Sequence, residues 1–143
     1  MQLSTILLGA LAAASTTLAA PAADIEARAV PAWTITGYKR TCNAADTSCT
    51  VTFGVDTHLA AATPCSFTLT GSPASHASTS GKICGPYTVS SGWSGQFGPG
   101  NGFTTLSVVD FAKKLIVWPA YSDSEAKNGV AVTPDKSYAP SAL

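Results

Sequence analysis

The chain has 143 residues, of which 11% are charged and 45% are hydrophobic, and its formal net charge at pH 7 is zero. This length fits one ordinary domain. Nucleic acid and anionic membrane surfaces are disfavoured as partners, because the chain carries no excess of positive charge to attract them.

The N-terminus predicts a secretory signal peptide. Residues 3–20 are almost wholly Leu, Ile, Ala, Ser and Thr without a charge, and they end in TLAA, which suits signal peptidase. The segment is short and rich in Ala for a membrane anchor, which needs about 20 predominantly apolar residues. We therefore expect residues 1–20 to be cleaved on export, and we expect no stable membrane insertion. Residues 21–28, PAADIEAR, form either a propeptide cut after Arg28 or a leader that stays attached.

The remaining residues, 29–143, are expected to form one domain of short strands. Apolar and polar residues alternate in successive segments, as in strands with one packed face, and turn residues separate these segments. The fold class predicted is therefore all-β, a single small β-barrel or β-sandwich of about seven to eight short antiparallel strands. The segments expected as strands are 30–42, 49–56, 65–70, 86–90, 93–97, Phe103–Asp110, 115–120 and, at an edge, 130–132.

Three intervening segments are expected to be irregular. Residues 58–63, HLAAAT, allow one turn at most, because Pro64 disfavours helix in the residue before it. Residues 71–81 consist mostly of Ser, Thr, Gly, Pro and Ala and predict a loop. In the C-terminal tail Pro134 and Pro140 limit regular structure, and Tyr138 is expected to hold the tail by packing back on the domain.

The densest apolar alternation predicts a hairpin. Its strands are Phe103–Asp110 and 115–120, both rich in β-branched and aromatic residues. Asp110, at the first position of the turn, is expected to accept backbone N–H bonds, which is a structural role. Trp33 and Trp118 lie among apolar residues of their strands and are expected to be buried.

Residues 91–102 form a glycine-rich segment with five glycines and Pro99. Such a segment must bend at φ values that few other residues tolerate. Trp93 and Phe97 lie within it and have the best claim to exposure among the large aromatic residues. An exposed aromatic ring offers an apolar face on which a sugar ring or a partner side chain can stack.

The four cysteines, Cys42, Cys49, Cys65 and Cys84, predict two disulfides, because an even number in an exported chain points to a disulfide framework. Three pairings are possible. We favour Cys42–Cys49, which closes the polar loop NAADTS, and Cys65–Cys84, which closes the serine-rich loop. No metal site is expected, because thiolate ligands would be oxidised outside the cell and no C-x-x-C or Cys/His cluster occurs.

The sequence offers little for catalysis. Asp56 and His58 are two residues apart and would project to one face of a continuing strand, which invites an acid–base role, but a surface turn with a local hydrogen bond is far commoner. His76 lies in the serine-rich loop, where nothing in the sequence fixes its orientation. The acidic residues are few and fall in turns, and the usual hydrolase and nucleotide-binding motifs are absent. We expect no catalytic residue, no cofactor and no enzymatic activity.

Long motifs in order carry a family resemblance. KRTCNAADTSC, ATPCSFTLTGSPAS, GWSGQFGPGNGFTTLSVVDFAKKLIVWPAY and SYAP resemble the small secreted fungal proteins known as hypersensitive-response-inducing elicitors. The similarity covers essentially the whole of residues 29–143. It implies a secreted, disulfide-bonded β-barrel or sandwich that plant cells perceive, with defence responses and local cell death as the outcome. The family supplies no catalytic residue to carry over.

The resemblance implies that the protein engages a plant cell-surface or apoplastic target through exposed loops. The loop SGWSGQFGPGNGF supplies the candidate surface recognition residues. The alternative is an extracellular carbohydrate-binding module that acts on cell-wall glycan, suggested by the aromatic residues of this loop and by the low charge. The candidate recognition residues are Trp93, Gln96, Phe97, Asn101 and Phe103.

Overall fold

The computed structural model of the chain describes residues 30–143. The expected signal peptide (1–20) and the propeptide or leader (21–28) lie outside these residues. The described part is all-β, which confirms the expected fold class, and four of its ten strands have only two or three residues. The elements are β1 Trp33–Cys42, β2 Ser48–Asp56, β3 Thr63–Thr70, the short helix η1 Ala74–His76, β4 Thr79–Cys84, β5 Tyr87–Ser94, β6 Phe103–Asp110, β7 Leu115–Val117, β8 Ala120–Ser122, β9 Lys136–Tyr138 and β10 Ser141–Ala142.

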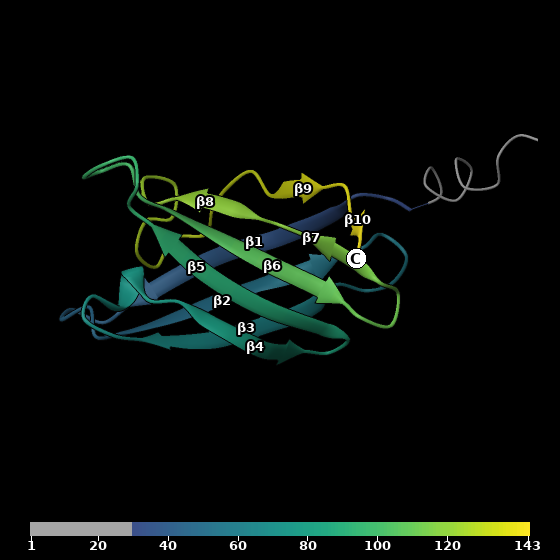
Figure 1. The fold of residues 1–143 in the computed structure, drawn as a ribbon, viewed down its shortest axis with the longest axis horizontal. Helices are drawn as coiled ribbons and strands as arrows, with labels where there is room; N and C mark the ends of the chain where they lie inside the picture. Colours follow the sequence, from purple (N-terminus) through teal and green to yellow (C-terminus); the bar gives the residue numbers. More distant parts are fainter. Residues whose placement is uncertain (1–29) are drawn as a thin grey trace, which may run out of the picture.

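The strands form two antiparallel sheets. One has the order β3-β2-β1-β9, and the other has the order β10-β7-β6-β5-β4, with β8 also paired to β6. In Figure 1 strands β5 and β6 of the six-stranded sheet cross in front of β1 and β2 of the four-stranded sheet. The sheets are separate hydrogen-bonded units, so the arrangement is a sandwich and not a closed barrel.

The core lies between the sheets and is built by period-two alternation. In β2, residues Cys49, Val51, Phe53 and Val55 are buried and alternate with more exposed neighbours. Two aromatic contacts join the layers: Tyr38 of β1 stacks on Tyr121 of β8 with ring centroids 3.8 Å apart, and Trp33 meets Tyr87 edge-on at 5.4 Å. The expected burial of Trp33 is therefore confirmed, since 2% of it is exposed.

Both disulfides have the predicted pairing. Cys42–Cys49 joins directly opposed residues of the neighbouring strands β1 and β2. Cys65–Cys84 joins β3 to β4, which belong to different sheets. The second bond therefore links the two layers covalently, whereas the first lies within one layer.

Three features of the expected strand pattern are wrong. Residues 79–81 were expected in a loop but begin strand β4. This strand has no apolar alternation and forms because its backbone pairs with β5. Residues 93–97 do not form a separate strand, because Gly92 stays in the ladder opposite Thr105 and β5 runs on to Ser94. Residues 130–132 form no strand, since Val132 makes a single backbone bond to Tyr38 of β1, and the edge strand is instead β9, beyond Pro134.

The predicted hairpin is confirmed, but its second strand, expected over 115–120, ends at Val117, and residues Ala120–Ser122 form the separate strand β8. Strands β6 and β7 pair with Asp110 opposite Leu115, and the buried Asp110 carboxylate accepts a hydrogen bond from the Lys113 N–H at 3.1 Å. The Tyr138 hydroxyl accepts a hydrogen bond from the Ala120 N–H at 3.3 Å, so this residue does hold the tail. Residues 58–63 are irregular until β3 begins at Thr63, as expected.

The expected burial of Trp118 is wrong, because 52% of this residue is exposed. Its neighbours Val117 and Pro119 face the core, and a strand turns alternate side chains to opposite faces. Because Val117 and Pro119 point into the core, Trp118 between them points to the outer side of the sheet.

Within residues 30–143 no helix has the length and apolar character to cross a membrane.

Candidate recognition surface

The candidate recognition residues gather at one end of the sandwich. Residues 95–102, here called the glycine loop, connect β5 to β6 and project from the left end of the molecule in Figure 1. Helix η1 and the turn between β1 and β2 lie at the same end (Figure 1). This surface is therefore assembled from segments that are far apart in the sequence.

Trp93 is held on several sides beneath this loop. Its indole Nε1–H donates a hydrogen bond to Asp123 Oδ2 at 2.8 Å, and the ring of His76 stacks on it with centroids 3.6 Å apart and planes 6° apart. Gly95 and Gly102 lie against the same ring, since a Cβ added at them would come within 2.5 Å of Cη2 and 2.7 Å of Cζ2. Trp93 is thus an anchor for the loop and only partly a contact surface.

The stack corrects the expectation for His76, whose orientation was expected to be free. His76 belongs to the short helix η1 between β3 and β4, and the indole face of Trp93 fixes its ring. This contact could not be predicted from the sequence, because the two residues lie on separate segments whose proximity depends on the sheet topology.

A partly buried ion pair, between Arg40 and Asp123, supports Trp93. Arg40 is 7% exposed, and its Nη2 lies 3.2 Å from Asp123 Oδ1, while its Nη1 donates to the Ser75 carbonyl oxygen at 3.2 Å. A buried charge is tolerable when it is paired and hydrogen-bonded in this way. Arg40, Ser75, His76, Trp93 and Asp123 form one closed set of contacts, which we call the Trp93 network.

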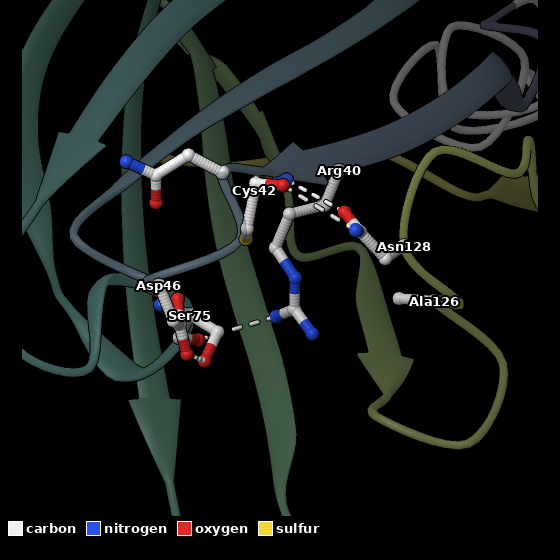
Figure 2. Close-up of a pocket in the computed structure, with 7 residues that line it drawn as sticks. Arg40, Cys42, Asp46, Ser75, Ala126 and Asn128 are labelled. Carbon is white, nitrogen blue, oxygen red and sulfur yellow. Dashed lines mark hydrogen bonds between the residues drawn. The ribbon is translucent and has the colours of Figure 1, made fainter.

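Asp46 extends this support to the disulfide turn. Its carboxylate accepts hydrogen bonds from the Ser75 backbone N–H at 2.8 Å and from the Ser75 hydroxyl, and the hydroxyl bond is the largest cause that lowers the pKa of Asp46 below its usual range. Figure 2 shows Arg40 reaching into a hollow between Ser75 on one side and Asn128 on the other. This hollow has a volume of about 260 Å³.

The outermost part of the surface is aromatic and polar. Phe97 is 64% exposed, and its ring stacks on the half-buried Phe103 with centroids 5.6 Å apart. The side chain of Asn101 donates to the Phe97 carbonyl oxygen at 3.3 Å, which closes the turn of the glycine loop. Gln96 is exposed beside them. The structure thus brings all five candidate residues to one end, with Phe97, Gln96 and Asn101 outermost.

A second hollow, of about 470 Å³, lies between the glycine loop and the Trp93 network. Both oxygens of the Asp123 carboxylate in this hollow already accept hydrogen bonds, one from Trp93 and one from Arg40. The Asp123 carboxylate therefore ties the Trp93 indole to the Arg40 guanidinium. The lining residues are His76, Trp93, Gly95, Gly98, Pro99, Gly100, Gly102 and Asp123.

Asp56 and His58 form the surface turn that was expected. Asp56 Oδ1 accepts a hydrogen bond from the His58 backbone N–H at 2.8 Å. His58 Nδ1 lies 3.6 Å from Asp56 Oδ2, which exceeds hydrogen-bonding reach, and its Nε2 lies 2.8 Å from Thr34 Oγ1. The His58 side chain is 51% exposed, so this set of groups faces solvent.

The comparisons with known proteins agree on one family. The family model described as Effector TSP1 matches residues 34–143. The chain belongs to this family. A relative from Hypocrea virens (strain Gv29-8 / FGSC 10586), also described as Effector TSP1, is 56% identical over 100% of this chain and 99% of its own length. The predicted resemblance to fungal effector and elicitor proteins is thereby confirmed.

Proposed function

We propose that this protein is a secreted effector that plant cells perceive, and that it triggers defence and hypersensitive cell death by surface recognition without transforming a substrate. Membership of the Effector TSP1 family supports the effector role. The target is a plant cell-surface or apoplastic component that contacts the glycine loop.

Two features support secretion. All four cysteines form disulfides, and disulfide bonds persist in oxidising compartments and are rare in the cytosol. Residues 3–20 have the composition of a signal peptide.

One observation carries the recognition role: the Trp93 network fixes a loop whose outer residues remain exposed. Side chains held rigidly before binding lose little conformational entropy when a partner arrives. Phe97, at 64% exposure, is the aromatic anchor that such a contact requires, and interface hot spots are commonly aromatic. The loop therefore combines order with an exposed apolar group.

The geometry around Asp56 and His58 supports a role without catalysis. In a catalytic Asp–His pair the carboxylate hydrogen-bonds the imidazole and orients it, whereas Asp56 Oδ2 and His58 Nδ1 lie 3.6 Å apart. The backbone bond within the turn accounts for Asp56 without any further function.

Infiltration of purified protein into leaves tests the proposal. Native protein is expected to cause electrolyte leakage and necrosis, whereas a reduced and alkylated sample loses the response because the recognised surface depends on the fold. The double variant Asp56→Ala/His58→Ala is expected to retain full activity. Equal necrosis from the reduced sample would contradict surface recognition, and a loss in the double variant would indicate chemistry at the turn.

A carbohydrate-binding module is the second candidate function. At the glycine loop this reading is weakened, because His76 covers one face of Trp93. The observation that favours it lies instead on the six-stranded sheet, at Trp118.

A further inference from the structure

Trp118 is displayed from a rigid backbone on the outer face of the six-stranded sheet, the face turned away from the core. Val117 pairs with Val108 and Ala120 pairs with Thr105, so the register continues across the interruption between β7 and β8. The Leu106 N–H donates to the Pro119 carbonyl oxygen at 2.7 Å inside this gap. The register therefore sets Trp118 opposite Ser107.

A groove lies beside the exposed indole. Its volume is about 260 Å³, and it is called the Trp118 groove below. Its floor consists of small residues in cross-strand pairs, with Ser90 opposite Ser107 and Gly92 opposite Thr105. The lining residues are Ser90, Ser91, Gly92, Thr105, Leu106, Ser107 and Trp118.

The chemistry of this groove identifies its ligand class. None of the lining residues is charged, so an ionic ligand would find no counter-charge there. Hydroxyl groups both donate and accept hydrogen bonds, which matches the hydroxyl groups of a sugar. The indole supplies the apolar surface on which the C–H face of a pyranose ring can stack.

The outer face offers further contacts along β6. Phe103 and Ser107 share this face, because they are separated by an even number of residues. At the usual rise per residue they lie about 13 Å apart. A chain laid along β6 from Trp118 would reach the half-buried Phe103 and the exposed Phe97 stacked on it. This spacing favours a stretch of polymer over a single sugar.

We propose that the Trp118 groove binds an uncharged polysaccharide chain, with Trp118 as the stacking residue and the hydroxyl groups of Ser90, Thr105 and Ser107 as hydrogen-bonding partners. The proposal rests on the second candidate function and is independent of elicitor activity. It assigns glycan binding to the outer face of the six-stranded sheet, whereas the effector response is assigned to the glycine loop.

Retention on insoluble cellulose, β-1,3-glucan and chitin tests the proposal, followed by titration calorimetry with the matching soluble oligosaccharide. Native protein is expected to bind at least one of the three polymers. Trp118→Ala is expected to weaken the affinity about tenfold or more, as truncation of an aromatic anchor does. Trp118→Phe should recover part of the loss, because a smaller ring still stacks. Ser107→Val should weaken binding while Trp118 is left in place.

The matched control is Phe111→Ala, which removes another exposed aromatic ring, 62% exposed, from the β6–β7 turn outside the groove. This variant is expected to bind like native protein. The proposal is overturned if no polymer retains native protein or if Trp118→Ala binds as well as native protein. A Trp118→Ala variant that alters self-association but leaves retention unchanged would overturn it in the same way. Leaf assays of the same variants separate the two functions, since Trp118→Ala should keep its full response.

Discussion

The role of Trp93, near the end of β5, follows from the residues that pack around its ring. His76 covers a face of its ring, Asp123 accepts its N–H, and Gly95 and Gly102 make room for its edge. The absence of a side chain at these two glycines is therefore a packing requirement. A glycine-rich segment predicts bends in the backbone, whereas Gly95 and Gly102 are needed because a side chain there would collide with the ring of Trp93.

Gly102→Ala is expected to destabilise the protein by about 1–3 kcal/mol, because the added methyl group would overpack the indole and the Asp123 carboxylate. Urea unfolding measures the change, and the tryptophan emission should shift as the environment of Trp93 is disturbed. Gly92→Ala is the matched control, since its added Cβ would meet nothing closer than the Ser78 Oγ at 3.8 Å. Equal stability of the two variants would contradict the packing role of Gly102.

Asp46 makes stability depend on pH in a defined direction. Hydrogen bonds from Ser75 lower the pKa of its carboxyl group, so its stabilisation is present above the unfolded-state value of about 3.9 and is lost as the pH falls below it. Asp46→Asn removes this contribution. The drop in unfolding free energy between about pH 6 and about pH 3 should be smaller in the variant than in native protein. An identical drop would refute the assignment.

At the scale of elements, the two disulfides differ in what they join. Cys42–Cys49 links neighbouring strands that are already paired, with a sequence separation of 7. Cys65–Cys84 links the two sheets, with a separation of 19. The longer loop constrains the unfolded chain more strongly, and its bond also fixes how the layers pack.

Removal of Cys65–Cys84 as a pair of alanines should therefore cost more than removal of Cys42–Cys49. On the chain-entropy model the two losses are about 3.3 and about 2.5 kcal/mol. Chemical denaturation of both double variants gives the comparison directly. The reverse order would show that the link between sheets is not the stronger constraint.

Elements with clear alternation could be predicted from the sequence, whereas elements defined by their partners could not. The strands around Val51 and Leu106 follow the period of two and were identified. Strand β4, TSGKIC, has no apolar period and exists because it pairs with β5. Trp118 was expected in the core because its sequence neighbours are apolar. The period of two in a strand instead puts Trp118 and Val117 on opposite faces of the sheet.

The candidate recognition surface could be predicted only in part for a similar reason. Its exposed residues lie in one continuous loop, so Phe97 and its neighbours were found from the sequence. The supporting residues Arg40, His76 and Asp123 come from three other segments and meet only in the folded sandwich. Nothing in the sequence around Arg40, two residues before Cys42, indicated that it would be buried and paired with Asp123.

At the scale of the whole molecule, the sandwich is a rigid support with two separate surfaces. One end presents the glycine loop above the Trp93 network, and the outer face of the six-stranded sheet presents Trp118. The pairing of β5, β6 and β8 in one sheet holds these surfaces in fixed relation, and the Cys65–Cys84 bond and the Tyr38–Tyr121 stack join that sheet to the other. Each of the two proposed partners is thereby assigned its own anchoring aromatic residue, Phe97 at the glycine loop and Trp118 on the outer face.

The most direct test of recognition through the glycine loop is electrolyte leakage from leaves infiltrated with Phe97→Ala, compared at equal dose with native protein and with Phe111→Ala. Both substitutions remove an exposed aromatic ring, so both variants should fold normally. The account predicts that Phe97→Ala loses most of the response, as for an interface hot spot, and that Phe111→Ala keeps it. A Phe97→Ala protein that is correctly folded and as active as the native form would contradict it.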